Sequence, residues 1–331
     1  MSPSLYAEAM GQPFSQRVAD PTWRAEAESW IAARLDDSGW HLTGTIEQPR
    51  IRPWSTQLVV PTSGGALWFK ANCRPMAFEP ALHATLARLA PDEVDTPVAV
   101  DADRGWILTA DRGTTLGDSH EPQLGDWQAV VRNAARLQQG LLGHRDDLLA
   151  SGLPDCSPAT VPTRFDRLLR LLTESSDDHP SLLGDDVAEQ LQARRPFVAE
   201  AAELLEASSV PSTLQHGDLH PWNVFAVDGG LRIFDFGDAQ WAHALEVLSV
   251  PFGWVTSRSS LSWPAVERVY ADEWGLDPDT FAALVRAAGL TQPVNRAFTW
   301  WTALQSATAA EWQEWGDAPA HHISNVLGTW P

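Results

Sequence analysis

Residues 213–239 constrain the fold more than any other stretch of this 331-residue chain. They read TLQHGDLHPWNVFAVDGGLRIFDFGDA, a short β-rich segment between long stretches with helical periodicity. The runs NVFAV and LRIFD flank the turn sequence DGG, a combination typical of a β-hairpin. Such a hairpin brings Asp235, at the end of its second strand, back beside Asn223. Because Asp218 lies in the loop just before Asn223, we expect all three side chains at one edge of the hairpin.

These three side chains are the kind that phosphoryl transfer requires. One carboxylate must orient the attacking hydroxyl and accept its proton, while a second carboxylate and an amide oxygen must hold Mg²⁺ against the phosphates. Asp, Asn and Gly are also common in turns, and any one of these residues alone would read as a turn residue. Because the loop, the hairpin and the strand-terminal Asp occur together in this order, the sequence favours a catalytic site.

The motifs HGDLHPWN and DFGDA resemble those of the aminoglycoside phosphotransferase family, a branch of the protein-kinase-like fold. The resemblance covers nearly the whole chain. It implies an α+β, bilobal fold, with a leading helix and a small antiparallel sheet in an N-terminal lobe (residues 1–110) and a mainly helical C-terminal lobe (residues 111–331). Matched by position, it implies that Asp218 is the catalytic base and that Asn223 and Asp235 are Mg²⁺ ligands.

The remaining sequence pattern agrees with this division into lobes. Asp20 and Pro21 are typical of a helix start, and Gly39 of its end. Apolar spacing and turn signals predict short strands in residues 44–71, a helix at 77–89, a hairpin at 96–110, and helices at 123–149, 162–174, 185–207 and 241–328.

Lys70 is the single lysine of the chain, since the other 22 of its 23 basic Lys and Arg residues are arginine. It ends the predicted strand ALWFK. The resemblance implies that Lys70 binds the α- and β-phosphates of a nucleotide and that Glu79, at the start of the next helix, forms an ion pair with it. An acidic residue in the first turn of a helix is favourable without any partner, which is the alternative for Glu79. A compact ammonium fits between two phosphates better than a planar guanidinium.

The contacts expected around the nucleotide depart from the protein-kinase pattern in one respect. The chain has no G-x-G-x-x-G sequence, and the corresponding turn is RPWSTQ. The resemblance implies that Ser55 and Thr56 of this turn contact the phosphates. It also implies that the connection between the lobes, with Thr109 and Asp111, lies at the nucleotide base.

Two histidines and one glutamate near the catalytic motif have other expected roles. The resemblance implies that His216 braces the catalytic loop. For His220 we expect a loop-stabilising hydrogen bond, with substrate contact as the alternative. Family members often carry an Asp in the helix after the metal loop, and Glu246 lies near that position, so its correspondence is open.

The acceptor is expected to bind in the helical lobe after residue 239. This segment has nine acidic and four basic residues, which permits a cationic acceptor, although the whole chain has a net charge of −20 and acidity also promotes solubility. The candidate acceptor contacts are Asp238, Glu311 and Glu314, the last two beside Trp312 and Trp315. The same spacing also fits tryptophans in the core and carboxylates in solvent.

The sequence thus favours a small-molecule kinase that uses ATP or GTP and Mg²⁺. The expected acceptor is a hydroxyl of an aminoglycoside-like compound, an amino sugar or a nucleoside, in antibiotic resistance or in metabolism as a sugar or amino-alcohol kinase. The missing glycine-rich loop and Ala-Pro-Glu sequence argue against a protein kinase. A non-catalytic nucleotide-binding protein is disfavoured because base, metal ligands and lysine are all present.

The charge and hydropathy of the chain restrict its partners. Nucleic acid is not an expected partner, because phosphate backbones need basic surfaces. No run of 18 apolar residues suggests a membrane span, and the first 20 residues lack the pattern of a secretion signal. We therefore expect a cytoplasmic protein, with monomer and dimer both open.

Overall fold

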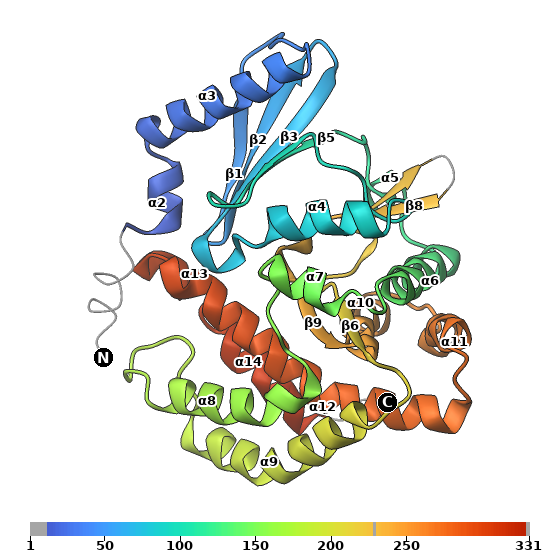
Figure 1. Ribbon diagram of the computed structural model, residues 1–331. Helices are drawn as coiled ribbons and strands as arrows, with labels where there is room; N and C mark the ends of the chain where they lie inside the picture. The colour runs from blue at the N-terminus through green and yellow to red at the C-terminus, as the bar shows by residue number, and fades with distance from the viewer. Residues whose placement is uncertain (1–11, 228–229, 329–331) are drawn as a thin grey trace.

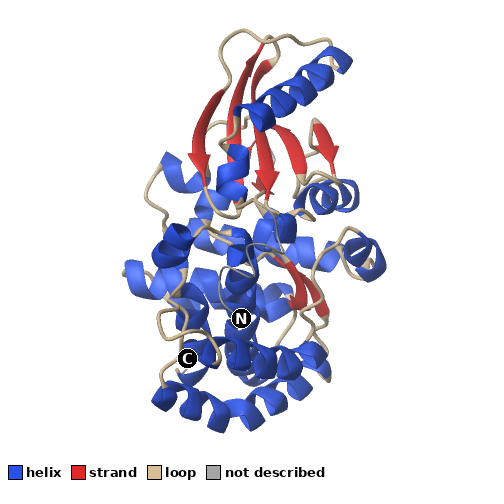
Figure 2. Cartoon of the chain, turned by 90° about the vertical axis from the view of Figure 1, so that its left-hand side faces the viewer, coloured by secondary structure: helices blue, strands red, loops and turns tan. Residues whose placement is uncertain are grey.

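The fold is described from a computed structural model, for residues 12–227 and 230–328. A sheet-containing lobe from the first part of the chain lies above a mainly helical lobe (Figure 1). Seen from the side, the larger sheet occupies the upper lobe and most helices the lower one (Figure 2). The small antiparallel sheet and the many helices confirm the predicted α+β class. The predicted boundary at residues 110 and 111 stays a prediction.

The upper lobe is built around one antiparallel sheet. Within the described residues its five strands pair in the order β1-β2-β3-β5-β4, and α4 is inserted between β3 and β4. The elements of this lobe are α2 (Phe14–Val18), α3 (Pro21–Asp37), β1 (Glu47–Ile51), β2 (Ser55–Thr62), β3 (Gly65–Asn72), α4 (Glu79–Leu89), β4 (Ala99–Asp101) and β5 (Trp106–Ala110).

One face of this sheet packs against α3. Burial alternates along β2 and β3, so that Leu58 and Phe69 are buried among the apolar residues of α3. The start of α3 is as predicted, because the carboxylate of Asp20 accepts a hydrogen bond of 2.7 Å from the amide of Thr22. The other face of the sheet is turned toward the lower lobe, and Lys70 lies on it.

The lower lobe contains helices and two short strand pairs. Its helices are α5 (Leu116–Ser119), α6 (Leu124–Gly140), α7 (Arg145–Ala150), α8 (Val161–Thr173), α9 (Asp185–Glu206), α10 (Ser249–Arg258), α11 (Trp263–Glu273), α12 (Pro278–Ala303), α13 (Ala309–Trp315) and α14 (Ala318–Ser324). The predicted helix at 123–149 is divided into α6 and α7, because Gly143 adopts a left-handed conformation with φ of 85°. None of the described helices has both the length and the apolar character needed to cross a membrane.

The strand pairs of the lower lobe position the HGDLHPWN and DFGDA motifs. The predicted hairpin is present as β7 (Val224–Val227) and β8 (Gly230–Ile233), and its turn residues 228–229 lie outside the described residues. A second pair, β6 (Ser212–Gln215) and β9 (Gln240–His243), encloses the motif at its two ends and was not predicted as a separate pair. The chain thus enters and leaves the motif on neighbouring antiparallel strands, which fixes the ends of the loop.

Candidate active site

A cavity of about 660 Å³ lies between the sheet of the upper lobe and the β7–β8 hairpin. This volume is within the range of ordinary small-ligand sites. Thr109 and Asp111, which we expected near the nucleotide base, both line it, and the amide of Asp111 donates to the carbonyl of Ala66 at 3.0 Å. The side chains that line its upper and lower walls include Gln57, Trp68, Lys70, Glu79, Phe225, Phe234 and Asp235.

Lys70 lies at the cavity wall between two carboxylates. Its Nζ atom is 2.6 Å from Glu79 Oε2 and 2.8 Å from Asp235 Oδ1, so the expected ion pair with Glu79 is present. Burial lowers the pKa of Lys70, but the charges of Asp235 and Glu79 outweigh burial and raise it above its usual value. Burial raises the pKa of Glu79, and the Lys70 ammonium opposes this rise. The three side chains join β3, α4 and the end of the hairpin.

Asp235 is held in an uncommon backbone conformation. Among the described residues it alone, glycines aside, has a positive φ, of 64°. The next two residues show how the turn is fixed: Phe236 is fully buried, and a side chain at Gly237 would come within 3.3 Å of Glu79 Oε2. Burial raises the pKa of Asp235, but Lys70 lowers it further, so its carboxylate is ionised. The turn therefore directs a charged carboxylate into the cavity.

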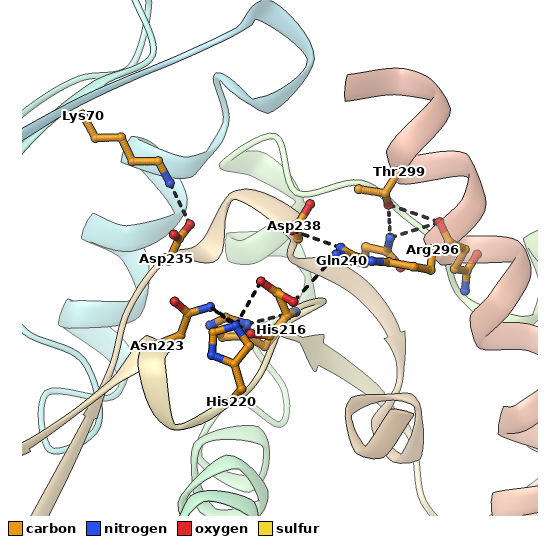
Figure 3. A network of polar contacts seen from close by, with 11 residues as sticks. Lys70, His216, His220, Asn223, Asp235, Asp238, Gln240, Arg296 and Thr299 are labelled. Atoms are coloured by element: carbon orange, nitrogen blue, oxygen red, sulfur yellow. Dashed lines mark hydrogen bonds and ion pairs between the residues drawn. The ribbon is translucent and has the colours of Figure 1, made fainter. Parts of the chain in front are cut away.

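Asn223 lies below Asp235 in the site (Figure 3). Its amide nitrogen donates to the backbone carbonyl of Asp218 at 2.9 Å, which leaves the amide oxygen for another partner. An amide oxygen and a carboxylate suit Mg²⁺, which takes its remaining ligands from phosphate and water. Among the described residues, no three His, Cys, Asp or Glu side chains converge as a metal site. The donor set fits an ion that arrives with a nucleotide better than one held by protein alone.

The loop that carries Asp218 is held by both predicted histidines. His216 Nε2 donates to the carbonyl of Phe234 at 2.9 Å, and its Nδ1 accepts from the amide of Asp218 at 3.3 Å. Burial lowers the pKa of His216, in agreement with this neutral tautomer. His220 Nε2 lies 3.3 Å from Asp218 Oδ2. Burial opposes ionisation of Asp218, but His220 and Arg296 lower its pKa below the usual range.

Arg296 of α12 is the main residue that the sequence analysis missed. Its guanidinium lies 3.0 Å from Asp238 Oδ2 and 3.7 Å from Asp218 Oδ1, although only 9% of the residue is exposed. Figure 3 shows it reaching from α12 toward the catalytic loop. Asp238, an expected acceptor contact, is therefore paired with a cation of the protein. A single Arg in a long helix has no motif, so no sequence signal could have indicated it.

Glu246 is fully buried and takes part in a different network. Its carboxylate accepts hydrogen bonds from the hydroxyl of Thr291 at 2.7 Å and from the amide of Asn295 at 3.0 Å. Burial raises its pKa to about 7. Both donors belong to α12, so Glu246 fixes that helix beneath the site. No hydrogen bond or ion pair joins it to Asp218 or Asp235 in the described part of the chain.

Ser55 and Thr56 lie on opposite faces of β2. The Thr56 hydroxyl donates to the backbone carbonyl of Arg50 at 2.8 Å and accepts from the side-chain amide nitrogen Nε2 of Gln48 at 2.9 Å. The Ser55 hydroxyl is buried and has no hydrogen-bond partner among the described residues. Neither lines the cavity, whereas Gln57 does. Their contact with phosphates stays a prediction.

The two expected acceptor contacts in α13 are not joined to the catalytic loop. Glu311 accepts hydrogen bonds from the amide and hydroxyl of Thr308, at 2.7 and 2.9 Å, and so caps its own helix. Glu314 is exposed. Trp315 packs edge-on against Trp54 of the β1–β2 loop, with ring centroids 5.3 Å apart. Part of α13 thus supports the upper lobe, and the acceptor role of its carboxylates stays a prediction.

Comparison with protein families shows the family to which the chain belongs. Residues 74–283 match the model of the phosphotransferase enzyme family. The chain belongs to this family. The family membership predicted from the motifs is confirmed, and the protein is a phosphotransferase. No curated protein matches the chain.

Solved structures of low sequence identity share the fold of this phosphotransferase. Macrolide 2'-phosphotransferase MphH from Brachybacterium faecium is 18% identical, with a TM-score of 0.58 over 89% of this chain and 97% of that one. Aminoglycoside 2'-phosphotransferase-IIIa, solved with GDP, is 16% identical, with a TM-score of 0.58 over 91% and 98%. A choline/ethanolamine kinase family protein from Mesorhizobium loti is 16% identical, with a TM-score of 0.61 over 92% and 95%. These similarities confirm the predicted kinase-like fold.

Proposed function

We propose that this phosphotransferase moves the γ-phosphoryl group of ATP or GTP to a hydroxyl group of a small molecule, with Mg²⁺. The observation that carries the proposal is that Lys70 and Asp235 line one cavity and form an ion pair there, while Asn223 and an ionised Asp218 lie in the loop next to Asp235. This reaction needs a lysine, held by a glutamate, for the phosphates, oxygen ligands for a divalent ion, and a carboxylate for the acceptor hydroxyl.

In the proposed reaction the residues of the chain position both substrates. Lys70, held by Glu79, binds the α- and β-phosphates. Asn223 and Asp235 would hold Mg²⁺, which would neutralise charge on the phosphates. Asp218 accepts a hydrogen bond from the acceptor hydroxyl and takes its proton as the acceptor oxygen bonds to the γ-phosphorus. The bond from the γ-phosphorus to the β–γ bridging oxygen breaks in the same step, and the nucleoside diphosphate leaves with that oxygen. Because its pKa is low, Asp218 is a weak base, and orienting the hydroxyl is its larger contribution.

The proposed acceptor is an aminoglycoside-like compound, an amino sugar or a nucleoside, and a metabolic sugar or amino alcohol is the alternative. The similar solved structures are named for macrolide, aminoglycoside and choline or ethanolamine substrates. They therefore agree with either acceptor class, the antibiotic-like compound or the metabolic amino alcohol. Arg296 reduces the negative charge that Asp218 and Asp238 present. The cationic groups of an acceptor would therefore need carboxylates elsewhere in the lower lobe. Glu314 is one exposed candidate.

A nucleotide-consumption assay across aminoglycosides, amino sugars, nucleosides, choline and ethanolamine, with ATP and with GTP, tests this proposal. We expect acceptor-dependent turnover that Asp218→Asn lowers by at least ~100-fold without loss of nucleotide binding. Asp146→Asn is the matched control, because the Asp146 side chain is 100% exposed. Tight nucleotide binding without turnover on any acceptor would favour a non-catalytic nucleotide-binding protein. Equal turnover of Asp218→Asn and wild type would refute the role of Asp218.

A further inference from the structure

Three side chains form a row across the sheet above the cavity. In the register of the strands, Arg50 of β1 is paired with Gln57 of β2, and Gln57 is paired with Lys70 of β3. Residues that face each other on neighbouring strands point to the same side of a sheet, with Cβ atoms about 5 Å apart. Arg50, Gln57 and Lys70 therefore lie side by side on one face.

This face is the one turned toward the cavity. Gln57 and Lys70 both line the cavity, while their strand neighbours Thr56, Leu58 and Phe69 are buried on the other face. Arg50 shares the side of Gln57 and is partly buried. The row therefore places one cation beyond Lys70, at the outer strand of the sheet.

The side chain of Arg50 differs from that of Lys70, because it forms no hydrogen bond or ion pair with any described residue. Its Nε atom is buried, yet it makes no hydrogen bond with any described residue, and no carboxylate of the described chain forms an ion pair with it. A buried, unpaired guanidinium nitrogen is costly, which indicates that an anionic partner is missing.

The row runs from the nucleoside end of the site toward the catalytic base. On one side of Lys70 lies β5, which ends at the interlobe residues Thr109 and Asp111. On the other side, the loop after β1 carries Trp54, whose ring centroid lies 5.4 Å from that of Trp300. The Trp300 ring is in turn in contact with the guanidinium of Arg296, which is paired with Asp218. Arg50 therefore lies at the end of the row where a terminal phosphate would be transferred.

We propose that Arg50 binds the terminal phosphate of the donor nucleotide and that Gln57 hydrogen-bonds the phosphates between it and Lys70. This inference rests on the proposed function. It supplies side-chain donors at the strand pair where this chain lacks a glycine-rich loop. Arginine suits the position because its planar fork binds phosphate oxygens in pairs.

Calorimetric titration with Mg·ATP, Mg·GTP and the corresponding diphosphates, without an acceptor, tests this assignment. For Arg50→Ala we expect triphosphate affinity to fall by at least about tenfold and diphosphate affinity by less than about threefold. Gln57→Ala should lower the affinity for the triphosphates and for the diphosphates by a similar factor. Arg50→Lys should recover part of the triphosphate affinity, because it restores the charge without the fork.

The matched control is Arg104→Ala, since Arg104 pairs with Glu26 of α3 on the opposite face of the sheet. It should change neither affinity, and a thermal melt of each variant reports whether the fold is intact. Equal losses of triphosphate and diphosphate affinity, or no loss, in a folded Arg50→Ala protein would overturn the assignment while leaving the proposed function intact. Failure of the wild type to bind any nucleotide would overturn both.

Discussion

Replacing Lys70 by Met should destabilise the fold, because it leaves Glu79 buried without its cation. The Glu79 side chain is only 3% exposed and its Oε2 lies 2.6 Å from Lys70 Nζ. A buried carboxylate without a partner must stay ionised at a large desolvation cost or take up a proton. Protonation limits the penalty, because a carboxyl with an ordinary pKa of 4.5 can be protonated at a cost of about 1.4 kcal/mol for each pH unit above that value.

The cost of protonating Glu79 sets the largest loss of stability in Lys70→Met and makes this loss depend on pH. The largest loss is about 5 kcal/mol near pH 8 and about 2 kcal/mol near pH 6. In Lys70→Met the pKa of Glu79 is higher in the folded than in the unfolded state, so the folded state binds more protons and stability falls as pH rises above about 4.5. Asp235 adds less, because its side chain is 33% exposed and therefore screened.

Urea unfolding followed by tryptophan fluorescence, near pH 6 and near pH 8, measures this effect. Wild type, Lys70→Met, Glu79→Gln and the double variant form a complete cycle. We expect the double variant to recover most of the loss, because it leaves no unpaired charge on Glu79. A Lys70→Met protein as stable as wild type near pH 8 would refute the reasoning, as would a double variant no more stable than Lys70→Met alone.

Three further predictions concern the lower lobe. Arg296→Gln should raise the pKa of Asp218 and move the acid limb of the pH–activity profile to higher pH; an unchanged limb would show that Arg296 does not act on this carboxylate. Gly217→Ala should cost at least ~2 kcal/mol of stability in a thermal melt, since φ is 85° and the new Cβ would lie 2.1 Å from the carbonyl oxygen of Asp238. Burial raises the pKa of Glu246 from 4.5 to about 7, so the free energy of unfolding falls as pH rises through that interval. In Glu246→Gln, urea unfolding should show a fall that is smaller by on the order of 3 kcal/mol.

The part of the site near the hairpin could be predicted because its geometry is local. A loop, a hairpin and an Asp just after its second strand determine how Asp218, Asn223 and Asp235 meet, and all of them lie within residues 213–239. Lys70 and Glu79 could be predicted for a related reason, since a strand followed directly by a helix leaves few ways to orient them.

The rest could not be predicted because it depends on long-range packing. Arg296 reaches the site only because α12 packs beneath it, and its helix pattern is that of any buried helix. The Ser-Thr pair at 55–56 could not be divided between the two faces of β2 without the pairing of β1 and β3, which places Gln57 toward the cavity. Strand register is thus the information that the residue types alone did not contain.

The charges of the site show why an unpaired arginine matters. Among the described residues, two cations beside the proposed transfer site each face two carboxylates: Lys70 faces Glu79 and Asp235, and Arg296 faces Asp218 and Asp238. Elsewhere on the cavity wall, Arg112 and Arg232 share Asp95. The first two groups therefore each have a net charge of −1, and together they repel the terminal phosphate of a nucleotide. At this end of the cavity, attraction must come from cations that bind with the nucleotide or from a cation that forms no ion pair with a carboxylate of the described chain. Lys70 can position phosphates, but Arg50 can add net attraction, and the two roles require two different cations.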